Sequence, residues 1–120
     1  MDWVEAKSDQ VAADINAAGG RAISVSGNVM DPAFPERLVE ETVKAFGKLN
    51  HIVNNAGYTH DGMIHKMSDK QWDAMLLVHQ TAPFKIIRAA SKYLVSWFTA
   101  NKINYATLMF FDICIAQKGR

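Results

Sequence analysis

Leu49-Asn50-His51-Ile52-Val53-Asn54-Asn55-Ala56-Gly57 is a short apolar run that ends in two amides, an alanine and a glycine. Two β-branched residues and the helical patterns on both sides of the run are typical of a buried parallel strand. At its end, two amide side chains can donate and accept hydrogen bonds, and a glycine leaves room for close approach. Ligands bind at the carboxyl ends of strands in open α/β sheets. The run therefore predicts either a ligand-binding strand end or a strand followed by an ordinary turn.

The composition is that of an ordinary globular protein. The chain has 120 residues, of which 49% are hydrophobic and 21% are charged, and this is about the length of one domain. Thirteen basic and twelve acidic residues leave a net charge of +1, so there is no electrostatic basis for binding nucleic acid or an anionic membrane. The single cysteine, Cys114, excludes an internal disulfide. With no signal peptide and no apolar run of bilayer length, we expect an intracellular, cytoplasmic protein.

A helix and a strand are expected before the central run. The apolar face of the first helix is formed by Val4, Val11, Ile15 and Ala18, and Gly19-Gly20 supplies its stop. Next, the segment 21–29 alternates small or polar residues with Ile23 and Val25, which predicts a strand that ends in Gly27-Asn28-Val29. Together with the strand 49–53, this segment predicts two strands of one sheet.

Two further helices have clear sequence signals. Asp31-Pro32 indicates a helix start, Gly47 indicates its end, and the residues expected on its buried face are Leu38, Val39, Thr42, Val43 and Phe46. A capping box at Ser68 and Gln71 opens a long helix in which Pro83 is expected to cause a kink. The residues expected on the buried face of the long helix are Trp72, Met75, Leu76, His79, Ala82, Ile86, Ala90 and Tyr93. The apolar segment 104–115 is a candidate third strand.

Helices and strands alternate in this reading, which predicts an α/β fold. We expect one incomplete doubly wound, Rossmann-like parallel sheet of two or three strands with flanking helices. The chain would form a single partial domain over residues 1–120, in which residues 96–120 are an atypical tail.

Three motifs in this order resemble the short-chain dehydrogenase/reductase family. Asn54-Asn55-Ala56-Gly57 is similar to the family's NNAG motif, Asn28-Val29 to the Asp-Val that ends its third strand, and Trp72 to Val78 to the start of its fifth helix. The resemblance runs from about residue 4 to residue 90 and is closest to the branch of the 3-oxoacyl-carrier-protein reductases and hydroxysteroid dehydrogenases. It implies a nicotinamide cofactor, NAD or NADP, and hydride transfer to or from a small carbonyl or alcohol substrate.

The resemblance also implies roles for individual residues. Asn28 and Val29 would hold the adenine of the cofactor, Asn54 would stabilise the central sheet, and the residues near the ribose or elsewhere on the cofactor would be Ala56, Gly57 and Val78. From residue type alone, Asn28 is equally interpretable as a loop amide that caps the next turn.

Several parts of the family's machinery are missing from these 120 residues. No glycine-rich phosphate-binding loop can be drawn from the seven glycines, which argues against binding of the cofactor by this chain. The three tyrosines, Tyr58, Tyr93 and Tyr105, lack a lysine four residues later, so no catalytic Tyr-x-x-x-Lys is present. His79 occupies the place of the family's helical Asn and is the one candidate for a catalytic role, although an inward-facing helical histidine is more commonly structural. His60 and His65, with Asp61 between them, are five residues apart in a loop and have no third ligand at a recognisable distance, so no metal site is expected.

The resemblance therefore implies a fragment of an NAD(P)-dependent oxidoreductase, and the missing parts predict that this chain is inactive by itself. In the family's strand order, two strands that this chain lacks lie between the strands 21–29 and 49–53. The strands 21–29 and 49–53 would therefore either pair directly with each other in a small sheet, or the chain would depend on a partner to fold. Two further readings stay open: a non-catalytic interaction module or homo-oligomer that uses the helix 69–98, and an enzyme whose missing parts lie on another chain.

Overall fold

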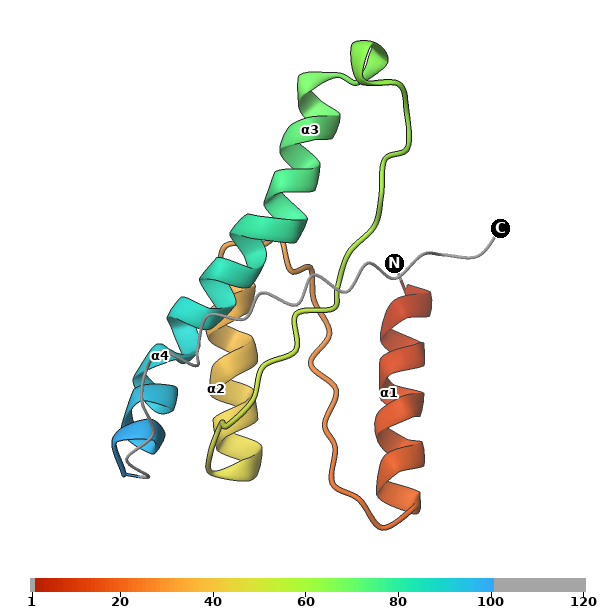
Figure 1. Ribbon diagram of the computed structural model, residues 1–120. Coiled ribbons are helices and arrows are strands. Elements are labelled where there is room, and N and C mark those ends of the chain that lie inside the picture. The colour runs from red at the N-terminus through yellow and green to blue at the C-terminus, as the bar shows by residue number, and fades with distance from the viewer. Residues whose placement is uncertain (1, 101–120) are drawn as a thin grey trace.

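The computed structural model describes the backbone of residues 2–100 and the side chains of residues 7–95. Four α-helices lie in this range: α1 (Asp2–Ala17), α2 (Phe34–Phe46), α3 (Asp69–Leu76) and α4 (Ala82–Ala100). A π-helical segment, Leu77–Thr81, joins α3 to α4 into one long rod, and a 3-10 turn, Ile64–Lys66, precedes α3 (Figure 1). The candidate strand 104–115 lies outside the described residues.

The two expected strands are not formed in the described part of the chain. Segments 21–29 and 49–53 are extended coils, and no backbone hydrogen bond joins them. Of the two outcomes expected for these segments, direct pairing in a small sheet is not seen in the described residues. The physical reason is that a strand exists only as part of a ladder, and neither segment has a neighbouring strand within hydrogen-bonding distance.

The helix ends follow their local signals, with one correction. Gly47 ends α2 in the left-handed conformation with φ 74°, and Ser68 and Gln71 form both bonds of the capping box at the start of α3. The start of α2, however, is at Phe34 and not at Asp31-Pro32. The carboxylate of Asp31 accepts a hydrogen bond from the Ala33 N–H at 2.9 Å, which holds a turn ahead of the helix, and Pro35 takes the first-turn position instead.

The core lies where α2 crosses α4. Val39 of α2 packs against Ala90 and Leu94 of α4, and all three side chains are at most 4% exposed. Ala90 is completely buried, and its small side chain lets the two helices approach closely. The partly buried residues packed against this cluster are Val43, Leu49, Ile52, Ala89 and Tyr93. The strand-like run 49–53 is therefore held by helix packing and not by a sheet.

The buried face of the α3–α4 rod differs from the expected one. Val78, Ala82, Ile86, Ala90 and Leu94 are buried at steps of four residues, whereas Trp72 is 56% exposed. Trp72 is exposed because α3 projects beyond α2 and contains no buried residue (Figure 1). In the π-helical segment, the Ala82 N–H donates to the Leu77 carbonyl five residues back. Pro83 has no N–H to donate to the carbonyl of His79, so the ordinary ladder cannot continue there. A π-helical turn satisfies the backbone there instead.

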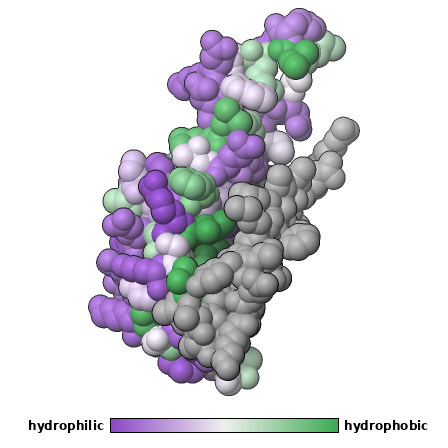
Figure 2. Space-filling model, turned by 60° about the vertical axis from the view of Figure 1, so that its left-hand side comes forward, coloured by the Kyte–Doolittle hydropathy of each residue, from purple (hydrophilic) through white to green (hydrophobic). Residues whose placement is uncertain are grey.

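The first helix contributes little to this core. Val11 and Ile15, which were expected on its buried face, are 57% and 43% exposed. Figure 1 shows α1 set apart from α2, with segment 21–29 running between them. On the face of the molecule shown in Figure 2, apolar side chains are exposed among hydrophilic ones.

Candidate functional site

The end of the central run is held by a histidine of the π-helical segment. His79 Nε2 lies 2.8 Å from the carbonyl oxygen of Tyr58, the residue directly after Gly57. A Cβ placed on Gly57 would lie 2.6 Å from Cε1 of the same imidazole ring, which is too close for any side chain. Gly57 has no left-handed backbone conformation, so the ring, and not the backbone angle, requires a glycine here.

Asn54, Ala56 and Val78 lie around this contact. Asn54 is half-buried and Ala56 is exposed, while Val78 is buried beside His79 in the helix. The structure thus brings Gly57 together with the segment that carries Val78 and His79. No hydrogen bond of the described residues runs from Asn28 or Val29 to this group.

Asn28 forms a turn of its own. Its side-chain oxygen accepts a hydrogen bond from the Met30 N–H at 3.0 Å, and its carbonyl accepts one from the Asp31 N–H at 2.9 Å. This is the geometry of a loop amide that caps the next turn. The amide nitrogen of Asn28 stays available, because the turn uses only its two oxygens, and Val29 beside it is half-buried.

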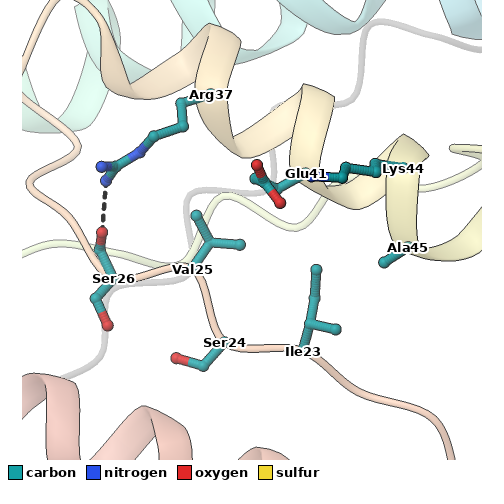
Figure 3. A pocket seen from close by; sticks show the side chains of 8 residues that line it. All are labelled: Ile23, Ser24, Val25, Ser26, Arg37, Glu41, Lys44 and Ala45. Atoms are coloured by element: carbon teal, nitrogen blue, oxygen red, sulfur yellow. Dashed lines mark hydrogen bonds between the residues drawn. The ribbon is translucent and has the colours of Figure 1, made fainter.

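Arg37 is a residue of this region that the sequence reading missed. Its guanidinium lies over the Phe34 ring at 5.3 Å from the ring centroid and donates a hydrogen bond to the Ser26 carbonyl (Figure 3). A Cβ on Gly27 would lie 2.6 Å from the same guanidinium. The signal available in the sequence was Gly27 next to Asn28, since a glycine there permits close approach by a side chain from α2.

Two open grooves run along segment 22–26, one on each side. The groove toward α2 has a volume of about 630 Å³ and is drawn in Figure 3; the groove toward α1 has a volume of about 530 Å³ and is largely apolar. Neither groove is lined by the residues expected to hold a cofactor, which are Asn28, Val29, Asn54, Ala56, Gly57 and Val78.

The described residues contain neither a metal-binding cluster nor a helix that could span a membrane. No group of three histidine, cysteine or acidic side chains in that part of the chain is arranged to hold a metal ion. Within residues 2–100, no helix has both the length and the apolar character needed to cross a membrane.

Comparisons with known proteins agree on one family. The family model described as short chain dehydrogenase matches residues 1–107. The chain is 38% identical over 85 residues to a hydroxyacyl-CoA dehydrogenase of Mycobacterium tuberculosis, covering 71% of this chain and 26% of that protein. It is 32% identical over 101 residues to a 3-oxoacyl-[acyl-carrier-protein] reductase of Synechocystis, covering 84% of this chain and 41% of that one.

A solved structure matches in the same way. The short chain dehydrogenase of Burkholderia cenocepacia in complex with NADP has a TM-score of 0.66 and 34% identity, over 71% of this chain and 35% of that one. The chain therefore spans between about a quarter and two fifths of the length of these proteins.

Proposed function

The chain belongs to the short-chain dehydrogenase family, and we propose that it supplies the adenosine side of a nicotinamide dinucleotide site in an NAD(P)-dependent oxidoreductase. The whole enzyme would move a hydride between the nicotinamide and a small carbonyl or alcohol substrate. The names of two relatives, a hydroxyacyl-CoA dehydrogenase and a 3-oxoacyl-[acyl-carrier-protein] reductase, support a substrate of this kind.

The observation that carries this proposal is the contact of His79 with Gly57 and Tyr58. The hydrogen bond at 2.8 Å fixes the loop directly after Asn54-Asn55-Ala56-Gly57, and the ring blocks one side of Gly57. A bound adenosine would therefore contact the exposed side of Ala56 and Gly57. His79 acts here as a positioning residue, because its Nε2 is occupied by a backbone carbonyl.

The residues present fit only part of a dinucleotide. The exposed backbone at Ala56-Gly57 and the free amide nitrogen of Asn28 suit a ribose and an adenine edge. A pyrophosphate needs backbone N–H groups of a glycine-rich turn at a helix start, and these 120 residues contain no such turn. When bound, the nicotinamide would supply the hydride, and no step of that transfer is assigned to this chain.

We expect the isolated chain to show no oxidoreductase turnover. Purified protein is incubated with NADPH and a panel of ketones that includes a β-ketoacyl thioester, and nicotinamide oxidation is followed by absorbance. A complete family member serves as the positive control.

Saturation-transfer NMR with adenosine tests the proposed half-site. Gly57→Ala should weaken the signal of bound adenosine, whereas Gly62→Ala, whose added methyl group would lie in open space, should not. Turnover above background would contradict the proposed inactivity, and equal signals from both variants would contradict the half-site.

A second candidate is an interaction module built on the α3–α4 rod. Trp72 and Phe84 are 56% and 54% exposed on this rod, which is unusual for side chains of their size. Exposed aromatic residues are common anchors of protein interfaces. The partner would be a complete family member or a second copy of this chain.

Light scattering and titration with a complete family member test the module. Trp72→Ala is expected to weaken the complex by roughly ten-fold or more, because truncating an aromatic anchor removes its buried contact area. Ile64→Ala is the control, since Ile64 is 89% exposed but lies outside the rod. A chain that forms no complex rules the module out.

A further inference from the structure

Asp61, in the loop that leads to α3, has no role in the sites described above. It is the only aspartate of the chain that a glycine follows, and no asparagine is followed by one. Asp61 and Gly62 are both exposed, and the carboxylate of Asp61 forms no hydrogen bond or ion pair with any described residue. A free carboxyl group therefore lies next to a backbone amide whose residue has no side chain.

The loop 59–62 is unrestrained between two anchored points. Before it, the Tyr58 carbonyl is held at 2.8 Å by the histidine of the π-helical segment, and after it the Met63 carbonyl accepts an N–H of the 3-10 turn at 2.8 Å. Within the described residues, no backbone hydrogen bond involves the loop itself, and its one ring contact is that of His60 with Tyr58, edge to face at 5.4 Å between centroids. A Cβ on Gly62 would meet nothing within 4 Å. The loop can thus change its backbone angles without breaking a hydrogen bond.

The other described aspartates lack this combination. Asp31 precedes a proline, which has no N–H, and its carboxylate already accepts the Ala33 N–H at 2.9 Å. The remaining ones lie in helices, where the backbone is fixed, and each is followed by a residue with a side chain; they are Asp2, Asp9, Asp14, Asp69 and Asp73. Asp61 is therefore the described aspartate whose carboxyl group a neighbouring amide nitrogen can reach most freely.

We propose that Asp61-Gly62 is a site of spontaneous succinimide formation, which converts Asp61 into an isoaspartyl residue. The amide nitrogen of Gly62 attacks Cγ of Asp61 in its acid form, a C–N bond closes the ring, and the carboxyl hydroxyl leaves as water with the amide proton. Water then opens the ring at the former backbone carbonyl. The chain now runs through Cβ and Cγ of residue 61, and the former backbone carbonyl is a free carboxylate. The water lost is regained, so no oxidant, reductant or cofactor is needed.

The product has the same composition and the same number of carboxylates as the original chain. Its backbone, however, is longer by one methylene group between the two anchored points. The modification therefore changes the spacing between the run 49–57 and α3 without changing the mass of the protein. It does not depend on the proposed nucleotide half-site, so a chain that binds no adenosine carries it equally.

Ageing of the purified chain at neutral pH and body temperature tests this site. Asp-N protease cleaves before aspartate and not before isoaspartate, so cleavage at Asp61, followed by mass spectrometry, should be lost progressively. Hydroxylamine added during ageing should trap the ring at residue 61 as a hydroxamate. Cleavage at Asp69 in the same digest is the internal control and should persist. Unchanged cleavage at Asp61, or equal loss at Asp69, overturns the proposal.

A matched variant and an unfolded sample separate the loop geometry from the sequence alone. Gly62→Ala should slow the loss by roughly ten-fold or more, because a Cβ hinders the attacking nitrogen and narrows the backbone angles of its residue. The open space around Gly62 lets this variant keep the fold. The folded chain should react within about ten-fold of the guanidinium-unfolded chain, since the loop has no hydrogen bonds that hold it. An unchanged rate in Gly62→Ala, or a stronger suppression by folding, contradicts the proposal.

Discussion

Leu94→Ala is expected to lower the free energy of unfolding by about 2–5 kcal/mol, the range found when a buried leucine leaves a cavity. Leu94 is 4% exposed and packs on Val39 and Ala90 at the crossing of α2 and α4. Domains have only about 5–15 kcal/mol of stability in total, so this loss is a large share. Chemical denaturation followed by circular dichroism measures it.

Val95→Ala is the matched control for this substitution. Val95 is the next residue of α4 and its side chain is 43% exposed, so its truncation should cost well under half as much. Leu49 and Ile52 pack on the same cluster as Leu94. We therefore also expect Leu94→Ala to speed hydrogen exchange in segment 49–53. Similar losses for both variants would show that the α2–α4 crossing is not the core.

The family and the helix ends could be predicted from the sequence because their signals are local. The capping box at Ser68 and Gln71 and the left-handed Gly47 depend on residues a few positions apart, and both are confirmed. The motif Asn54-Asn55-Ala56-Gly57 identified the family that the family model also matches.

The strands could not be predicted in the same way, because a strand depends on partners far away in the chain. The alternation of Ile23 and Val25 is real, and it sets which way these side chains point. Alternation alone does not supply a neighbouring backbone, so segment 21–29 is extended without being a strand. The similarity to solved family members supports an α/β fold, while the strands themselves are not formed in the described residues.

The prediction of which residues of the long helix are buried failed in part, and for a different reason. The expected face assumed an uninterrupted period of 3.6 residues from Trp72 to Tyr93. Pro83 indicated a disturbance, which takes the form of a π-helical segment at Leu77–Thr81, and N-terminal to it α3 has no buried residue because no other described element packs against it. The buried residues C-terminal to it, Ala82, Ile86 and Ala90, match the expectation, and Trp72 does not.

Gly57→Ala is the substitution expected to act most directly on the candidate site. The new methyl group would lie 2.6 Å from Cε1 of His79, so either the ring or the loop must move. Overpacking of this kind costs about 1–3 kcal/mol, and movement of the ring also removes the hydrogen bond to the Tyr58 carbonyl. Because Gly57 is exposed, we expect the substitution to release the loop after residue 57. Faster hydrogen exchange and faster limited proteolysis in that loop would measure this release.

A double-mutant cycle with His79→Ala separates this clash from a general intolerance of alanine in the loop. His79→Ala alone loses the bond to the Tyr58 carbonyl and should release the loop by roughly 0.5–1.5 kcal/mol. In that background the clash is gone, so Gly57→Ala should add almost nothing. Gly62→Ala, with nothing within 4 Å of its added methyl group, should be neutral in both backgrounds. Additive costs would mean that Gly57 is required for the backbone itself and that the imidazole of His79 is not what holds the end of the run 49–57.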